Sequence, residues 1–166
     1  MAETWFISDT HFGHANILKF EPILRPFKNI EEHDQFIINE WNRLVGENDI
    51  VYHLGDVAFK DFNITLLAEL KGHKRVVLGN HDQFNRLAPY FENFYGVKYW
   101  KEGILLSHIP VHIGQMERFK FNFHGHLHSN LVKDADPRYF NLSCEWTYNR
   151  PIHYDELKER MNAIQS

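Results

Sequence analysis

Residues 120–128 have the sequence Lys-Phe-Asn-Phe-His-Gly-His-Leu-His, which joins an aromatic run to three histidines in five positions. The apolar run predicts a strand over residues 120–124 that ends where the histidines begin. The two imidazoles that follow Gly125, at His126 and His128, can each reach a different ion of a close pair. Because a packed core rarely holds so many imidazoles, we expect a metal-binding turn at this strand end.

Four other segments show the same arrangement, a run that predicts a strand followed at once by oxygen or nitrogen donors. We expect these strands at residues 4–8, 50–54, 75–78 and 104–107. The donors that follow them are Asp9 with His11, Asp56, Asn80, and His108. In open α/β sheets, the carboxyl ends of the strands form the crevice in which ligands bind. The five segments together therefore predict a site for two metal ions.

The chemistry of the first two groups suits divalent ions. Asp9 and His11 are two positions apart, so in an extended segment their side chains point the same way. A carboxylate with an imidazole suits Mn, Fe, Co, Ni or Zn. Asp56 has two carboxylate oxygens and can bridge two ions, and Gly55 lets the backbone turn sharply before it. Taken alone, each group has an ordinary alternative, such as a helix-capping aspartate or a turn.

The third and fourth groups add a neutral oxygen ligand and a proton donor. Asn80 offers an amide oxygen, and the adjacent His81 can stand beside the metals and donate a proton to a leaving group. A turn with a helix N-cap is the alternative for this segment, and a lone His108 would favour a core histidine. Two ions about 3.5–4 Å apart clamp a phosphoryl group and activate a bridging water as nucleophile.

The rest of the chain predicts one mixed α/β domain over residues 1–166. Apolar residues at helical spacing predict a helix over residues 31–45, with Asn29 as its N-cap and Gly46 as its stop. Further helices are expected at 64–70 and 155–164, a hairpin at 97–107, and a late strand at 139–143. Helices alternate with strands early and strands cluster late, which favours a mixed sheet, or two packed sheets, flanked by helices.

Composition narrows the class of protein. The formal net charge is −4, which disfavours bulk nucleic-acid binding but leaves room for a nucleotide or chain end bound at metals. The one cysteine, Cys144, excludes an intramolecular disulfide, and a reducing cytoplasm fits. We expect no signal peptide and no membrane span. The sequence leaves the oligomeric state open.

The five motifs resemble, in this order, the pattern of the calcineurin-like metallophosphoesterase superfamily: D-x-H, G-D, G-N-H-D/E, H and G-H-x-H. They cover roughly residues 5–128, and Asn141-Leu142-Ser143 with Arg150-Pro151-Ile152 is similar to the small bacterial and phage-type members. The resemblance implies a four-layer αββα fold, a two-sheet β-sandwich flanked by helices on both sides. It also implies a metal-dependent phosphoric ester hydrolase.

Carried over by position, the resemblance implies two divalent metal ions, with Mn as our first expectation and Fe, Ni, Zn, Co or Mg as alternatives. His81 would be the proton donor or would stabilise the transition state. One ion would be held by Asp9, His11, Asp56 and His128, and the other by Asp56, Asn80, His108 and His126.

Two departures from the wider superfamily bear on the substrate. The phosphoprotein phosphatases extend the second block to G-D-x-x-D-R-G, whereas residues 55–61 here are Gly-Asp-Val-Ala-Phe-Lys-Asp, which argues against a protein phosphatase. The same difference leaves Asp61 and Asp82 as the two candidates for orienting His81. The chain also lacks a large insertion, so we expect an open site that takes a small phosphodiester or phosphomonoester, such as a nucleotide or cyclic nucleotide.

Several alternatives remain at this stage. His14, three residues after His11, is expected to contact substrate phosphate or to be a solvent-facing residue. His124 could orient a ligand, whereas His53 is expected in the core. The competing functions are a nuclease acting on nucleic-acid ends and a non-catalytic interaction scaffold; intact ligand positions place the scaffold last. No role is expected for His33, His73, His112 and His153.

Overall fold

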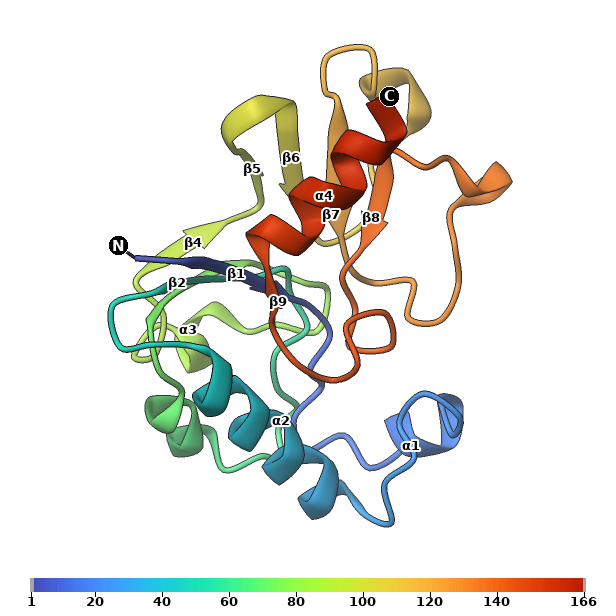
Figure 1. The fold of residues 1–166 in the computed structure, drawn as a ribbon. Helices are drawn as coiled ribbons and strands as arrows, with labels where there is room; N and C mark the ends of the chain where they lie inside the picture. The colour runs from blue at the N-terminus through green and yellow to red at the C-terminus, as the bar shows by residue number, and fades with distance from the viewer. Residues whose placement is uncertain (1, 166) are drawn as a thin grey trace.

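The computed structural model describes residues 2–165, which form two β-sheets with helices around them (Figure 1). The first sheet has the strand order β4-β3-β2-β1-β9. Strands β1 to β4 are mutually parallel, and β9 runs antiparallel to β1 at the edge. Its strands are β1 (Thr4–Ile7), β2 (Ile50–His53), β3 (His73–Val77), β4 (Asn93–Tyr95) and β9 (Ile152–His153).

The second sheet has the order β5-β6-β7-β8. Its first pair is an antiparallel hairpin, and the other pairs are parallel. Its strands are β5 (Val97–Tyr99), β6 (Ile104–Ser107), β7 (Phe121–His124) and β8 (Tyr139–Asn141). The α-helices are α1 (Ile17–Phe20), α2 (Ile30–Leu44), α3 (Phe84–Leu87) and α4 (Tyr154–Gln165). The 3₁₀ helices are η1 (Ile64–Glu69), η2 (Lys101–Gly103), η3 (Ile113–Gln115) and η4 (Lys133–Ala135).

Helix α2 begins where the sequence predicts it. The Asn29 side chain accepts a hydrogen bond from the Glu32 backbone N–H at 2.8 Å, and the Glu32 carboxylate accepts one from the Lys28 N–H at 2.9 Å. Both satisfy N–H groups that a helix start leaves unpaired. Ile37 and Trp41 of the apolar stripe of α2 are fully buried. The predicted helix over residues 31–45 is thus confirmed to within one residue at each end.

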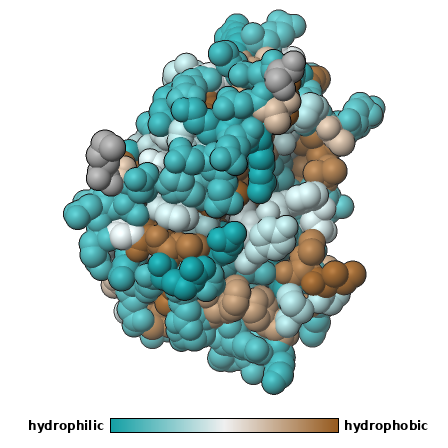
Figure 2. Space-filling view, in the orientation of Figure 1, coloured by the Kyte–Doolittle hydropathy of each residue, from teal (hydrophilic) through white to brown (hydrophobic). Residues whose placement is uncertain are grey.

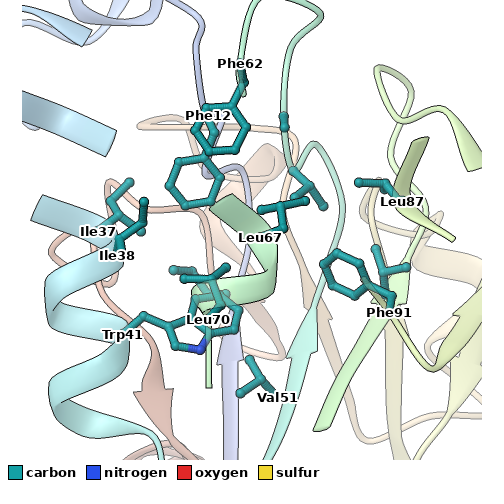
Figure 3. Packing of buried hydrophobic residues seen from close by; sticks show 14 of the residues in the cluster. Phe12, Ile37, Ile38, Trp41, Val51, Phe62, Leu67, Leu70, Leu87 and Phe91 are labelled. Carbon is teal, nitrogen blue, oxygen red and sulfur yellow. The ribbon is translucent and has the colours of Figure 1, made fainter. Parts of the chain in front are cut away.

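One hydrophobic cluster lies between the first sheet and the helices outside it (Figure 3). Ile37, Ile38 and Trp41 of α2 extend from the helix into this cluster, which also contains Val51 of β2 and Leu67 of η1. Aromatic rings lie at one end of the cluster, where Phe12 and Phe62 stack with their centroids 4.9 Å apart. This cluster fixes the loops that follow β1 and β2 onto the helical layer.

A second cluster lies between the two sheets. Phe6 of β1 meets Phe123 of β7 edge to face at 5.4 Å, and Tyr154 and Leu157 of α4 pack into the same cluster. Tyr139 of β8 lines a pocket together with residues of η3 and η4. The two sheets thus pack face to face with helices around them, which confirms the expected two-sheet αββα fold class.

The differences from the predicted elements are local. Residues 64–69 form the 3₁₀ helix η1 rather than a regular α-helix, and the sequence patterns missed α1, α3, β4 and β9, all of which are four residues or shorter. No helix in residues 2–165 is long and apolar enough to cross a membrane. The face drawn in Figure 2 is mostly hydrophilic with separate hydrophobic patches, one of them over the region of α1, where Phe20 and Ile23 are exposed.

Candidate active site

The structure brings all the expected ligand side chains to one place, where the ends of strands from both sheets meet. Asp9 follows β1, Asp56 follows β2 and Asn80 follows β3 in the first sheet. His108 follows β6, and His126 follows β7, in the second sheet. The sheets are joined here because the Asp9 Oδ2 atom accepts hydrogen bonds from the His126 backbone N–H at 2.9 Å and from the Ser143 hydroxyl at 3.1 Å.

One half of the site consists of Asp9, His11 and His128. The Nε2 atoms of His11 and His128 lie 3.6 and 3.9 Å from Asp9 Oδ1. His11 Nε2 also lies 3.6 Å from Asp56 Oδ2. Asp56 therefore faces this half of the site as well as the other.

The other half consists of Asp56, Asn80, His108 and His126. His108 Nε2 lies 3.4 Å from Asp56 Oδ2 and 3.0 Å from Asn80 Oδ1. His126 Nδ1 lies 3.0 Å from the same Asn80 oxygen. His108 Nδ1 donates to the Leu54 carbonyl at 2.8 Å, which leaves its Nε2 directed toward the acidic and amide oxygens.

The donor atoms fit a pair of divalent cations. Asp9 Oδ1 and both ring nitrogens of His11 are buried and have no hydrogen-bond partner among the described residues. Buried polar atoms are almost always hydrogen-bonded, so these unpaired atoms require an explanation. Carboxylate, imidazole and amide donors together suit first-row transition ions. Cation-binding groups can indeed be drawn around Asp9–His11–His128 and around Asp9–Asp56–His108.

Five of the ten non-glycine residues with positive φ among residues 2–165 lie at this site. Asp9, His11, Asp56, His126 and His128 all have positive φ angles, between 48° and 68°. Side-chain-bearing residues rarely adopt this left-handed conformation, and where they do, the strain commonly marks a functional site. At each of these positions it turns the side chain into the space between the strand ends.

At Gly55, a side chain is excluded by lack of space as well as by the backbone conformation. Its φ is 103°, and a Cβ at this position would lie 2.6 Å from His108 Nδ1 and 2.7 Å from the Gly79 nitrogen. No side chain can be accommodated there without moving His108. The glycine in this motif therefore allows the turns after β2 and β3 to approach one another.

The carboxylates and imidazoles of the site shift one another's pKa values. Burial alone would raise the pKa of Asp9, but the neighbouring imidazoles of His11, His108 and His128 outweigh that effect and hold its pKa far below the usual range. Burial would lower the pKa of His108, but the adjacent carboxylates of Asp56 and Asp9 raise it to about 9. Such mutual stabilisation of carboxylates and imidazoliums shows that the pocket favours positive charge.

His81 lies beside both halves of the site, and its ring forms no hydrogen bond with any of their described residues. Its backbone N–H donates to Asp56 Oδ1 at 2.9 Å, and its ring centroid lies 5.0 Å from that of Phe59 and 6.0 Å from that of His11. Asp82, one of the two candidates for orienting His81, is engaged elsewhere: its carboxylate accepts backbone N–H bonds from Asp56, Val57 and Gly79 at 2.8–2.9 Å. Asp82 therefore shapes the turns that carry the ligands.

His14 and Asp61 lie with His81 on the wall of a pocket of about 430 Å³ next to the ligand cluster. The His14 ring stacks on Phe59 at 3.9 Å, and its Nδ1 is buried without a partner among the described residues. Burial lowers the pKa of His14 to about 4, so the ring is neutral at pH 7. His124 and His53 are buried as strand residues, outside the ligand cluster.

Sequence reasoning missed a buried support behind Asp9 and His128. Glu145 lies 3.2 Å from His128 Nδ1 and pairs with Arg25 at 2.6 Å, and both side chains are inaccessible to solvent. Arg25 also donates to the carbonyl oxygens of Asp9 at 2.6 Å and Thr10 at 3.2 Å. His33, expected to have no role, lies 3.0 Å from Arg25. These residues belong to no motif, and only the unusual burial of Arg25 identifies them.

This geometry can be compared with known proteins. The calcineurin-like phosphoesterase family matches residues 3–164. The chain belongs to this family. Members of the calcineurin-like phosphoesterase family are metal-dependent phosphoric ester hydrolases, so this chain is an enzyme of that class.

Three similar proteins extend the comparison. The uncharacterized protein MJ1445 of Methanocaldococcus jannaschii is 34% identical over 164 residues, covering 93% of this chain and 89% of its own. The gene 66 protein of Mycobacterium phage D29 is 26% identical, covering 99% of this chain and 98% of its own. The crystal structure of a protein of unknown function, AQ665 of Aquifex aeolicus, has a TM-score of 0.79 and 31% identity over 96% of this chain and 99% of its own. Each of these matches spans most of the length of the relative.

Proposed function

We propose that this protein is a dinuclear-metal-dependent phosphoesterase that hydrolyses a small phosphodiester or phosphomonoester, with a nucleotide or cyclic nucleotide as the first candidate. The observation that carries the proposal is the set of buried, unpaired donor atoms of Asp9 and His11 facing the Asp56–His108 pair. Family membership supplies the reaction class, and this donor set supports two neighbouring ions rather than one.

Each ligand has an assigned place in the proposal. Asp9, His11 and His128 would hold one ion, Asn80, His108 and His126 the other, and Asp56 would bridge them. Manganese is our first choice, because mixed carboxylate, amide and imidazole donors suit it. When bound, two such ions would neutralise a phosphoryl group and supply an activated water as nucleophile.

The residues around the ions complete the chemistry. Neither ring nitrogen of His81 has a hydrogen-bond partner among residues 2–165, so its imidazole is free to donate a proton to the leaving oxygen. Its backbone N–H is anchored on Asp56 Oδ1, which keeps the ring beside the bridging carboxylate. The Arg25–Glu145 pair would hold Asp9 and His128 in place while the phosphoryl group binds.

The test is hydrolysis by chelator-stripped protein with single divalent ions added back. Bis-p-nitrophenyl phosphate and p-nitrophenyl phosphate report diester and monoester turnover, and a panel of nucleotides and 2′,3′- and 3′,5′-cyclic nucleotides reports the natural class. We expect metal-dependent turnover of at least one small substrate. Turnover confined to oligonucleotides, with salt-sensitive binding, would replace this proposal with a nuclease; no turnover of any substrate in folded protein would refute it.

A further inference from the structure

The pocket of about 430 Å³ beside the ligand cluster lies on the side of the proposed leaving group. His81, the proposed donor to the leaving oxygen, forms part of its wall. The wall continues along the loop after β2, through Phe59 and Lys60, to the start of α3 at Gln83 and Arg86. A substrate whose phosphorus lies at the ions would therefore extend its leaving group into this pocket.

The ionisable groups of the pocket favour an anion. Lys60 and Arg86 carry positive charge, and Asp61 is the carboxylate on the same wall. The two histidines of the wall, His14 and His81, are counted as neutral, as in the formal charge of the whole chain. The formal charge of the wall is thus +1, in a chain whose net charge is −4. The wall of this pocket therefore carries a net positive charge, whereas the chain as a whole carries a net negative charge.

Arg86 is held in position by the protein and still has donors to offer. Its Nη2 donates to the backbone carbonyls of Phe59 at 3.2 Å and Lys60 at 3.5 Å. These bonds hold the guanidinium against the loop after β2. Its Nε and Nη1 groups have no acceptor among the described residues. A fixed guanidinium with free N–H groups binds phosphate better than a mobile one, because less rotamer freedom is lost on binding.

We propose that this pocket binds a second anionic group on the leaving-group side, so that the preferred substrates are phosphate esters whose leaving group carries a further phosphate. Arg86 and Lys60 are the residues that recognise the second phosphate. The proposal rests on the phosphoesterase function above, because that function defines which side is the leaving-group side.

The experiment compares three inhibitors of metal-loaded enzyme that differ only at one end. Propylphosphonate carries one phosphonate, 1,3-propanediphosphonate adds a second on the third carbon, and 4-phosphonobutyrate carries a carboxylate there instead. Inhibition constants are measured against hydrolysis of bis-p-nitrophenyl phosphate and checked by calorimetric titration. Since a hydrogen bond to a charged group contributes roughly 1.5–3 kcal/mol, we expect the second phosphonate to tighten binding about 10- to 100-fold. A smaller gain for the carboxylate would identify phosphate as the preferred anion.

The variants separate recognition from the integrity of the loop. Arg86→Gln and Lys60→Gln should each remove most of the gain from the second phosphonate and leave the inhibition constant of propylphosphonate unchanged. Arg86→Gln also removes the hydrogen bonds from Arg86 to the loop, so its effect alone could come from a displaced loop. Lys60→Gln leaves those bonds in place and therefore tests recognition separately. Arg118→Gln, which changes an exposed arginine outside the pocket, is the matched control and should retain the full gain.

Three results would overturn the proposal. Equal binding of propylphosphonate and 1,3-propanediphosphonate to the unmodified enzyme would show that the pocket holds no second anion. An equal gain for carboxylate and phosphonate would reject phosphate as its specific ligand. Retention of the gain in both variants would remove Arg86 and Lys60 from recognition. In each of these results, metal-dependent turnover and inhibition by propylphosphonate would remain, so the phosphoesterase proposal would stand; its own failure would appear as loss of both.

Discussion

Glu145 Oε1 lies 3.2 Å from the Nδ1 atom of His128, and this contact determines which nitrogen of His128 faces the site. The same oxygen accepts a hydrogen bond from Arg25 Nε at 2.6 Å, so Arg25 holds the Glu145 carboxylate in place beside the imidazole. With Nδ1 engaged by Glu145, Nε2 is the nitrogen left to face Asp9. Groups that orient metal-binding histidines in this way contribute strongly to metal affinity.

The first prediction concerns this support. Glu145→Gln should weaken binding of the ion held by His128 by about 10- to 100-fold and leave the other ion in place. Calorimetric titration of chelator-stripped protein with Mn²⁺ measures both affinities. Arg25 is left buried with its charge unbalanced, so the variant should also lose thermal stability and must be titrated well below its melting temperature. Glu159→Gln, an exposed change on α4, is the control; equal affinities in both variants would contradict the role of Glu145.

The second prediction separates proton donation from metal binding. His81→Ala should retain both ions, because the backbone N–H that anchors residue 81 on Asp56 remains. The turnover rate for a substrate with a poor leaving group should fall by about 10²- to 10⁴-fold, with a smaller loss for p-nitrophenyl esters, whose leaving group needs little proton assistance. Rates equal to those of the exposed control His73→Ala for every leaving group would remove His81 from the chemistry.

The third prediction uses a glycine that has no room for a side chain. A Cβ on residue 125 would overlap Asp9 Oδ2 and Ser8 Oγ, so Gly125→Ala should displace the Asp9 carboxylate. A displacement of this kind is expected to cost about 100-fold in turnover while circular dichroism stays unchanged. Gly96→Ala is the matched control, since its new Cβ meets nothing within 4 Å. Full activity in Gly125→Ala would show that the position of Asp9 is not critical.

The fourth prediction concerns acid stability and His53. Its Nε2 lies 2.9 Å from Thr10 Oγ1, whose hydroxyl donates to Val57 O, and its Nδ1 accepts from the Gly55 N–H, so the buried ring is neutral. Burial lowers its pKa to about 3, although the charges of Asp9 and Asp56 oppose the shift. The unfolded chain, with an ordinary pKa of about 6.5, binds more protons than the folded chain between these values. Stability from this residue is therefore complete above about pH 6.5 and is lost progressively as the pH falls toward 3.

Urea unfolding of chelator-treated protein at pH 7 and pH 5 measures this effect. His53→Gln keeps one donor and one acceptor but cannot take up the proton. The unmodified protein should lose about 2 kcal/mol more than the variant between the two pH values, as follows from about 1.4 kcal/mol per unit of pKa difference. The subtraction removes the titration of the ligand histidines, which both proteins share. Equal losses would show that His53 is not held neutral by the fold.

The sequence predicts the ligand set because each donor directly follows a recognisable strand and because parallel strand ends meet at one edge of a sheet. It predicts α2 for an equally local reason, since Asn29 and the apolar stripe lie within one segment. The strands β4 and β9 have only three and two residues, too few to show the alternation of apolar and polar residues that predicts a strand. They form because they pair with β3 and β1 in the folded sheet.

The support behind the site could not be predicted because its members are distant in the sequence. Arg25 and Glu145 are 120 positions apart, and neither lies in a metal-binding motif. Asp82 illustrates the same limit at short range: it directly follows His81, yet folding turns its carboxylate toward three backbone N–H groups rather than toward the imidazole. Motif spacing identifies which residues meet at the site, whereas tertiary packing decides which others hold them there.

The measurement that tests the dinuclear mechanism most directly is metal stoichiometry and turnover in Asp56→Asn, beside Asp155→Asn as an exposed aspartate control. Asp56 faces both His11 and His108, at 3.6 and 3.4 Å, so its carboxylate is the group that the proposal assigns to both ions. We predict that the unmodified protein and the control bind two Mn²⁺ ions per chain and hydrolyse bis-p-nitrophenyl phosphate. Folded Asp56→Asn should bind fewer than two ions and show only background turnover. Undiminished turnover of Asp56→Asn would contradict catalysis by a bridged pair of ions.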